Sequence, residues 1–354
     1  KRIKLIMAYT TINKFTEHFN TVLYSGDDAT TRNITGFGFQ PDWIWNKARN
    51  AAYNHYLIDA VRGSPGKVII SNLSNAEDND SGFQNSFKGF ISDGNTIGQV
   101  SGYEVNDSGV NYVQWGWKAG GTGSSNSDGS ITSTVSANTT AGFSIVKYTG
   151  TGGAQTVGHG LGVAPKMIIV KNLDSSENWA VWHTVLGENE YLGLNQTNGQ
   201  ATNSAIWNST YPTSTVFSIG NNARTGGSNN YVAYCFAEVT GFSKFGKYVG
   251  NGNASGSFVY TGFKPKFVMY KRYSASGNDW VIVDSERPGY NVNNKELYPN
   301  LNSAEGTTDL LDTLSNGFKL RRTHASANAD GSSYLYMAFG QTLVGSNNTP
   351  ATAR

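Results

Sequence analysis

The chain has 354 residues, of which 15% are charged and 42 are glycine, whereas globular proteins average about 25% charged residues and about 7% glycine. Aromatic residues make up 12%, and the formal net charge is +2. A glycine-rich, aromatic and charge-poor sequence is typical of strands joined by tight turns, so we expect an all-β fold.

The same figures exclude several classes of protein. The low net charge argues against a nucleic-acid partner, because polyanion binding needs a basic surface. No apolar run approaches the roughly 18 residues that a membrane-spanning helix needs, so we expect no membrane insertion. Cys235 is the single cysteine, which excludes an internal disulfide framework and a cysteine-rich zinc site.

Three segments of the chain share one sequence frame. Each begins at a tyrosine, has a proline 17 positions later (24 to 41, 148 to 165, 248 to 265) and a lysine 6 positions after that proline. The frame residues are Tyr24, Pro41, Lys47, Tyr148, Pro165, Lys171, Tyr248, Pro265 and Lys271. Proline lacks an N–H and is found at the first residue of strands. An apolar run follows each proline, and this predicts a buried strand.

Each segment then continues in the same way. A second apolar run ends at Asp59, His183 or Asp284. A strand flanked by glycine or asparagine follows, and we align residues 89–92, 216–220 and 317–320. An aromatic strand closes each segment, at residues 112–117, 231–236 and 334–339. We therefore expect an all-β fold of three tandem β-sandwich-like repeats, each antiparallel and about 100 residues long. Beads in a row and one pseudo-threefold body both fit this pattern.

The repeats divide the chain into six parts. They are an N-terminal arm at 1–18, a first repeat at 19–118, a linker rich in Gly, Ser and Thr at 119–141, a second repeat at 142–241, a third repeat at 242–341 and a flexible tail at 342–354. The composition of the linker predicts a loop or flexible connection. The second and third repeats join directly, so we expect them to pack together. Met7 has the character of a natural start, and residues 1–6 are then expected to be a translated leader.

No catalytic, cofactor or metal site is expected from the motifs. The five histidines have no spacing typical of a metal site, and no phosphate-binding glycine loop occurs. Asp59 and Asp284 recur at equivalent positions, but in different repeats, so they do not form the carboxylate pair of one glycosidase site. His183 takes the same position in the second repeat, where a structural role at the end of a strand explains it better than catalysis.

Aromatic side chains are the candidates for ligand binding, because tryptophan and tyrosine stack on sugar rings. The tryptophans within the repeat strands are expected in the core. The better candidates lie in predicted loops and are Trp207, Tyr211, Tyr290 and Tyr298. The alternative is that these four plug the ends of the sandwiches.

Several stretches of the sequence resemble one family of phage proteins. They are residues 7–14, 19–24, 38–45, 231–239 and 242–248. The chain resembles repeat-bearing structural proteins of tailed phages of marine bacteria, including cyanophages. This resemblance implies a virion structural protein of the tail or fibre type, and it implies no catalytic residues.

We therefore expect a non-enzymatic protein on the virion surface, assembled in the host cytoplasm. The first expectation is a tail fibre or spike for host-surface attachment, with residues 1–18 as a virion anchor. The alternatives are a capsid decoration protein (head fibre) and a carbohydrate-binding or glycan-depolymerising surface protein. The expected partners are other virion proteins, further copies of the chain in a homotrimer, and a host-surface glycan.

Overall fold

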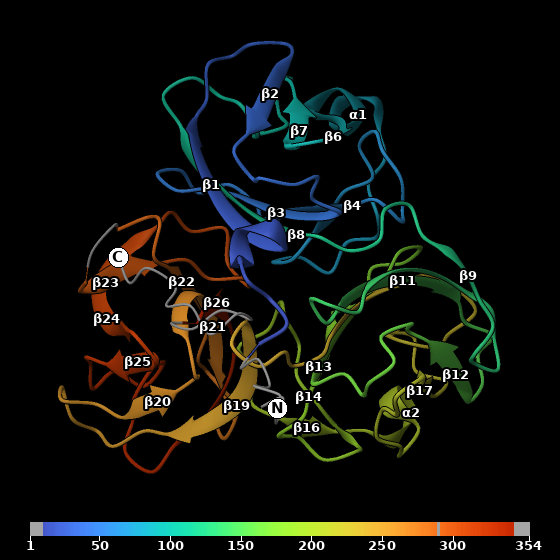
Figure 1. Ribbon diagram of the computed structural model, residues 1–354. Coiled ribbons are helices and arrows are strands. Elements are labelled where there is room, and N and C mark those ends of the chain that lie inside the picture. Colours follow the sequence, from blue (N-terminus) through green and yellow to red (C-terminus); the bar gives the residue numbers. More distant parts are fainter. Residues whose placement is uncertain (1–9, 289–290, 343–354) are drawn as a thin grey trace, which may run out of the picture.

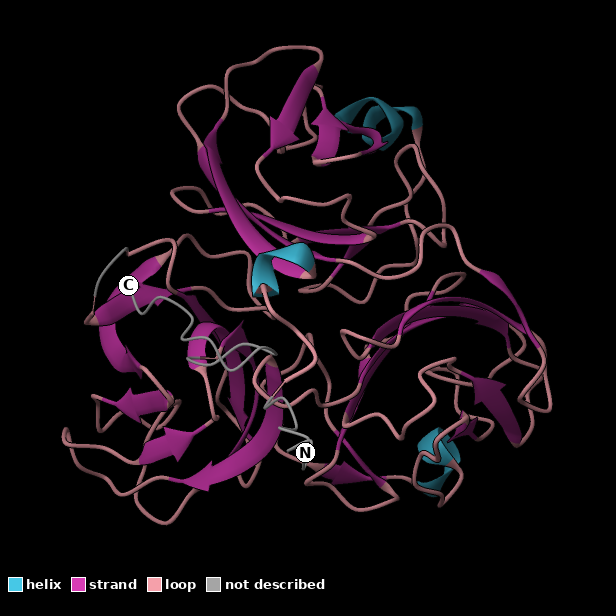
Figure 2. Ribbon diagram, in the orientation of Figure 1, coloured by secondary structure: helices cyan, strands magenta, loops and turns pink. Residues whose placement is uncertain are grey.

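A computed structural model describes residues 10–288 and 291–342 of the chain. Strands account for 42% of the residues and helices for 4%, which confirms the predicted all-β fold. Figure 2 shows three groups of strands arranged around a common centre. None of the helices in the described part of the chain has the length and apolar character that crossing a membrane requires.

Unit 1 is the β-sandwich of the first repeat. Its elements are η1 (Phe15–Glu17), β1 (Phe19–Ser25), β2 (Arg32–Thr35), β3 (Trp43–Ala48), β4 (Tyr56–Asp59), β5 (Ile69–Ile70), α1 (Ser81–Ser86), β6 (Phe87–Ile91), β7 (Gly94–Ile97) and β8 (Asn111–Trp117). The inner sheet has the order β1-β8-β3-β4-β5 and the outer sheet has the order β2-β7-β6. The inner sheet is the one that faces the other two units (Figure 1).

Unit 2 is the β-sandwich of the second repeat with two additional strands at its start. Its elements are β9 (Ser124–Asn126), β10 (Ser133–Asn138), β11 (Phe143–Thr149), β12 (Gln155–Gly158), β13 (Met167–Asn172), β14 (Ala180–His183), β15 (Glu190–Tyr191), β16 (Ala201–Thr202), α2 (Ser204–Trp207), β17 (Val216–Ile219) and β18 (Asn230–Phe236). The inner sheet runs β14-β13-β18-β11-β10-β9, the outer pair is β12-β17, and β15 pairs with β16.

Unit 3 is the β-sandwich of the third repeat. Its elements are β19 (Ser243–Val249), β20 (Phe258–Tyr260), β21 (Lys264–Arg272), β22 (Trp280–Asp284), β23 (Asn293–Glu296), β24 (Gly306–Leu314), β25 (Gly317–Leu320) and β26 (Ser333–Gln341). The inner sheet runs β19-β26-β21-β22 and the outer sheet β20-β25-β24-β23. Proline precedes β3 and β13 as expected, whereas β21 begins one residue before Pro265 and has a bulge between Pro265 and Phe267.

The repeated tyrosine has the same role in each unit. Its ring stacks on the first tyrosine of the last strand, and its hydroxyl donates a hydrogen bond to a backbone carbonyl of the loop before that strand. The stacked pairs are Tyr24–Tyr112, Tyr148–Tyr231 and Tyr248–Tyr334, with ring centroids 4.9, 5.2 and 4.8 Å apart. The acceptors are the carbonyls of Val105, Thr225 and Ala327. The sequence frame is therefore a packing motif, in which the polar end of each buried tyrosine is satisfied.

The three inner sheets enclose one central core, which none of the units contains alone. Trp43 of unit 1 stacks on Tyr234 of unit 2 at 4.3 Å between ring centroids. Phe339 of unit 3 stacks on Phe19 of unit 1 at 5.4 Å and lies 6.0 Å from Phe236 of unit 2. The inner strands are thus covered on both faces, and this explains their nearly continuous apolar runs.

Three equivalent backbone hydrogen bonds close the ring of units. In each, an N–H of one unit donates to the carbonyl two residues after the repeated lysine of the next. They are Glu77 N to Leu173 O, Gln200 N to Tyr273 O and Glu305 N to Arg49 O, at 2.9, 2.8 and 2.6 Å. The contacts run from unit 1 to 2, from 2 to 3 and from 3 back to 1. The repeats therefore form one pseudo-threefold body and are not beads in a row.

Two details of the sequence analysis are wrong. Residues 119–141 are not a flexible linker, because β9 and β10 lie within them and β10 pairs along its whole length with β11. The strand of unit 1 that corresponds to β17 and β25 is β7, not the aligned segment 89–92, since β7 pairs with β2 as β25 pairs with β20.

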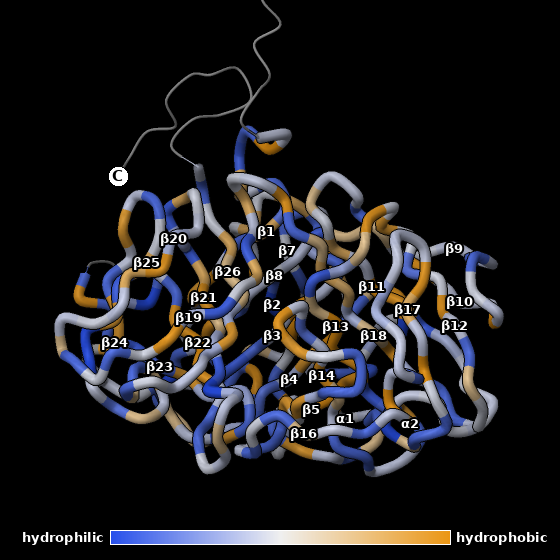
Figure 3. Tube along the Cα trace, turned by 90° about the horizontal axis from the view of Figure 1, so that it is seen from below, coloured by the Kyte–Doolittle hydropathy of each residue, from blue (hydrophilic) through white to orange (hydrophobic). Residues whose placement is uncertain are grey.

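The two ends of the described chain meet at one end of the body. Ile12 is buried in the central core, and the backbone N–H of Phe15 donates to Oε1 of Gln341 at 3.0 Å. A methyl group on Gly241 would lie 3.1 Å from the side chains of both Thr10 and Thr342. Residues 10–18 of the expected arm are thus packed on the body, whereas most of the expected tail lies outside the described residues. The opposite end carries α1 and α2 (Figure 3).

Candidate functional site

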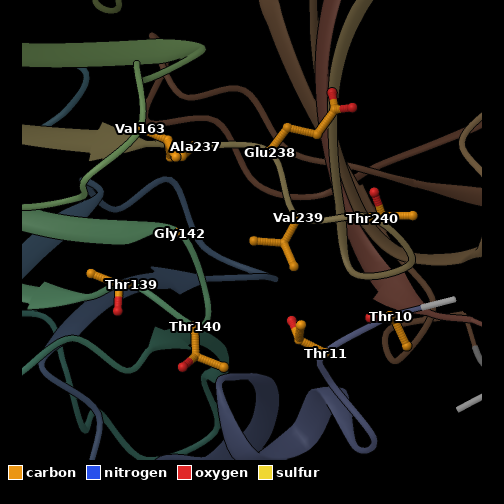
Figure 4. Close-up of a pocket in the computed structure, with 10 residues that line it drawn as sticks. All are labelled: Thr10, Thr11, Thr139, Thr140, Gly142, Val163, Ala237, Glu238, Val239 and Thr240. Carbon is orange, nitrogen blue, oxygen red and sulfur yellow. The ribbon is translucent and has the colours of Figure 1, made fainter. Parts of the chain in front are cut away.

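A cleft of about 550 Å³ opens at the end of the body where the chain ends meet (Figure 4). Four segments line it: the stretch before η1, the β10–β11 turn, the turn before β13 and the connection between units 2 and 3. The lining residues are Thr10, Thr11, Thr139, Thr140, Gly142, Val163, Ala237, Glu238, Val239 and Thr240. Five of the ten lining residues are threonines, and Val163, Ala237 and Val239 add apolar surface.

Glu238 is the charged residue among those that line the cleft. Its Oε1 lies 2.6 Å from Nζ of Lys244, and its Oε2 accepts a hydrogen bond from the backbone N–H of Phe245. The carboxylate is thus held by unit 3, and the described residues that line the cleft offer no second carboxylate for acid–base catalysis. The chemistry of the cleft suits hydrogen bonding to a hydroxylated ligand or to a peptide backbone. The threonine pairs 10–11 and 139–140 were visible in the sequence, but nothing in the sequence indicated that they meet.

The four aromatic candidates do not form one site. Trp207 ends α2 and is only 2% exposed in the core of unit 2, where it cannot reach a ligand in solvent. Tyr211 is 51% exposed, and its ring lies edge-on to Trp182 with centroids 6.2 Å apart. Tyr298 is half-buried against the core of unit 3, and burial raises the pKa of its hydroxyl. Tyr290 lies outside the described residues.

Sequence reasoning missed two exposed aromatics in a strand. Phe258 and Tyr260 of β20 are 48% and 59% exposed, on either side of the buried Val259. The alternation of this strand was the available signal, because it places every second side chain on the outer face.

The polar side chains at the ends of β4, β14 and β22 connect neighbouring units. Asp59 forms a buried ion pair with Arg62 and accepts a hydrogen bond from Tyr234 of unit 2 at 2.8 Å. Asp284 forms the equivalent pair with Arg287 at 2.6 Å. His183 donates from Nε2 to the carbonyl of Tyr336 in unit 3, since its Nδ1 accepts the N–H of Val185. Burial lowers the pKa of His183 to about 4.

The three repeated lysines lie buried at the end of the body opposite the cleft. Lys171 donates to the carbonyls of Asn172 and Glu177 and to that of Ser74 in unit 1. Lys271 likewise reaches Thr197 of unit 2. Burial lowers the pKa to about 7 for Lys47 and to about 8 for Lys171 and Lys271. Lys47 donates to the carbonyls of Ala48 and Ala51 in its own unit. All three amines thus bind backbone carbonyls, those of Lys171 and Lys271 across a contact between units, and we assign them a structural role.

Among residues 10–288 and 291–342, no three His, Cys, Asp or Glu side chains come together as a metal site would require. The remaining histidines are also engaged within the body. His159 lies in the turn before β13 and has its ring 3.2 Å from the carbonyl of Thr213. His55 is buried, and Trp45 donates from its indole to the Nδ1 of His55 at 2.8 Å.

Comparison with known families gives a match over most of the chain. A family described as a domain of unknown function (DUF7483) matches residues 14–342. The chain belongs to this family. The match begins just before η1 and ends just after β26, so the family corresponds to the whole three-unit body and not to a single repeat. No curated protein has a significantly similar sequence.

Proposed function

We propose that the chain is a non-enzymatic structural protein exposed on a phage particle, where it acts as a tail fibre or spike for attachment to the host surface. The resemblance of residues 7–14, 19–24, 38–45, 231–239 and 242–248 to phage structural proteins is the starting point. The observation that carries the proposal is the closed pseudo-threefold body, whose described chain ends lie at one end.

This geometry suits a protein that is attached to the particle at one end of its body and exposes the opposite end to the surroundings. The segment from Thr10 to the end of η1 packs on the central core and on Gln341, so an attachment formed by the preceding residues would be rigidly coupled to the body. The opposite end, with α1 and α2, would then face outward. In this arrangement the residues before Thr10 would carry the contact with the particle, and residues 10–18 of the predicted anchor would join that contact to the body.

A structural role also accounts for the residues that would otherwise suggest catalysis. Asp59, Asp284 and His183 each contact the next unit, and their hydrogen-bonding capacity is used there. A hydrolase would need two carboxylates facing one cleft, with the pKa of one of them raised. The cleft in Figure 4 has Glu238 alone in its lining, paired with Lys244.

The expected homotrimer remains a prediction. A trimer of single repeats would bury the inner sheets around a threefold axis, and one copy of this chain already does so. The central core therefore forms without further copies. Assembly would instead follow from contacts with other virion proteins.

Capsid decoration is the alternative, because a body attached by one end serves this role equally well. A carbohydrate-binding surface protein is the second alternative, and the hydroxyl-lined cleft together with the exposed Phe258 and Tyr260 favours it. The decoration alternative also places the chain on the particle surface, and the carbohydrate-binding alternative also involves a host glycan. One set of measurements separates the three functions.

The test is mass spectrometry of purified particles, followed by separation of tails from capsids and an adsorption assay. The proposal predicts that the chain is present in tails and that antibodies against it block adsorption. Presence in capsids alone would support decoration. Absence from the particle would contradict both, and a glycan array would then test the carbohydrate-binding alternative.

A further inference from the structure

Unit 2 covers one side of its sandwich with its own chain. Strand β10 pairs antiparallel with β11, which would otherwise be the edge of the inner sheet. Ile131 forms a parallel bridge to Val157 of β12, and Ser130 exchanges hydrogen bonds with Thr156. Residues 124–138 therefore cover the edges of both sheets.

The equivalent positions of unit 3 follow from strand pairing. Val157 lies opposite Phe217 in unit 2, as Val259 lies opposite Phe318 in unit 3, and all four are buried. Thr156 and Gly158, the neighbours of Val157, thus correspond to Phe258 and Tyr260. In unit 2 these neighbours lie beneath the covering segment, because a methyl group on Gly158 would be 1.7 Å from Oδ1 of Asn126.

Unit 3 leaves the corresponding side open within the described part of the chain. There, β19 pairs with β26 alone and β20 with β25 alone. Val249, Phe258 and Tyr260 on these two strands are 53%, 48% and 59% exposed. We call the outer edges of β19 and β20 with these three side chains the open edge. They are three of the six exposed large hydrophobic residues in the described part of the chain.

Unpaired edge strands attract other chains, and large exposed apolar side chains on a soluble protein mark interaction surfaces. Unit 1 has a more polar version of this side, with Asn33 and Thr35 at the positions of Phe258 and Tyr260. The open edge of unit 3 therefore differs from both sister units: it has neither a covering segment nor a polar surface.

We propose that the open edge binds an extended segment of a partner protein, which adds a strand to β19 and covers β20. The covering segment of unit 2 indicates the chemistry of this partner. That segment is an extended chain rich in Ser and Thr, with apolar residues spaced an even number of positions apart, such as Ile131, Val135 and Ala137, and we expect the same character in the partner segment. Lys247 is exposed on β19, and Lys319 lies opposite Phe258, so the partner segment is neutral or acidic and not basic. Backbone pairing would provide affinity, and Phe258 and Tyr260 would select apolar side chains.

The probe is a fluorescein-labelled peptide with the sequence of residues 124–139, titrated with the full chain and followed by fluorescence anisotropy. We expect saturable binding, and hydrogen exchange should slow at residues 243–249 and 258–260 in the complex. Phe258→Asp and Tyr260→Asp should each weaken binding at least tenfold. Tyr211→Asp, a change at an equally exposed tyrosine in unit 2, should leave it unchanged. Near-identical thermal melts of the three variants would exclude misfolding as the cause.

Three results would overturn the proposal. The first is absence of saturable binding, or binding that is equally weakened by Tyr211→Asp. The second is tenfold tighter binding by a chain that ends at Thr342, because the chain's own last residues would then be the occupant. The third is self-association of the free chain that Phe258→Asp abolishes, as measured by sedimentation, because this would assign the open edge to a second copy.

Discussion

The carboxylate of Asp284 in unit 3 accepts a hydrogen bond of 3.0 Å from the indole of Trp115 in unit 1, 169 positions earlier in the chain. The same contact recurs around the body with different side chains, since Asp59 meets Tyr234 and His183 meets the backbone of Tyr336. Each unit is thus connected to the next through the end of the same strand. These contacts explain why polar residues occupy buried positions at the ends of otherwise apolar strands.

Removing the charge of Asp284 should destabilise the whole body. The side chains of Asp284 and Arg287 are fully buried, with 2.6 Å between Oδ2 of Asp284 and Nε of Arg287. Asp284→Asn would therefore leave Glu305 as the one carboxylate paired with this buried guanidinium in the described structure. Breaking a buried pair in this way costs about 3–5 kcal/mol. The free energy of unfolding, measured in urea, should fall by this amount.

Glu286→Gln is the matched control, because it removes the neighbouring but exposed pair with Lys266. Exposed pairs contribute about 0–1 kcal/mol. Equal effects of the two substitutions would contradict the structural role that we assign to Asp284.

His183 should make the body less stable in mild acid. Its pKa is about 4 in the folded chain and about 6.5 when unfolded, so between these values the unfolded state binds more protons. The stabilisation is therefore complete above pH 6.5 and is lost as the pH falls toward 4. The shift of about 2.5 pKa units corresponds to about 3 kcal/mol.

The measurement is urea unfolding of the wild-type chain and of His183→Gln at a series of pH values. Glutamine can still donate to the carbonyl of Tyr336 but does not titrate. The loss of stability between pH 6.5 and 4 should be smaller in the variant by about 3 kcal/mol. Parallel curves for the two proteins would contradict the prediction.

The covering segment of unit 2 can be tested at a single glycine. A methyl group on Gly129 would lie 2.3 Å from the backbone carbonyl oxygen of Thr156 in β12, whereas one on Gly153 would meet nothing within 4 Å. Gly129→Ala should therefore displace residues 124–130, speed their hydrogen exchange and cost about 1–3 kcal/mol. Gly153→Ala should change neither quantity. If Gly129→Ala leaves the exchange of residues 124–130 unchanged, the segment is not packed as described.

The shared central core predicts that the three units unfold together. Phe339 of unit 3 lies against Phe19 of unit 1 and Phe236 of unit 2, so loss of one unit exposes the inner sheets of the other two. Calorimetry should show one transition whose calorimetric and van't Hoff enthalpies agree. Phe339→Ala should lower the temperature of that transition without splitting it into several. Three resolved transitions would indicate independent beads.

The sequence was sufficient for the strands and the repeat, because alternation and the Tyr–Pro–Lys spacing are local signals. Burial of the repeat tryptophans also followed, and Trp43, Trp115 and Trp280 are at most 1% exposed. The closure of the ring was not predictable. Its contacts use backbone groups, or side chains that differ between units, such as Asp59 and His183.

Two misplaced segments have physical reasons. Residues 133–138 resemble a linker because four of their six side chains are polar, yet they form β10 through backbone pairing with β11. Trp207 was expected in a loop, but the short helix α2 turns its ring into the core of unit 2. The threonines of the cleft come from three separate segments, and no local pattern connects them.

The most direct test of the account is a cryo-EM map of the intact particle whose genome encodes this chain. We expect the pseudo-threefold body on the tail, with Thr10 and Thr342 toward the particle and α1 and α2 outward. Bodies arranged on the capsid lattice would replace attachment with decoration. A particle that lacks the body altogether would contradict the proposed virion function.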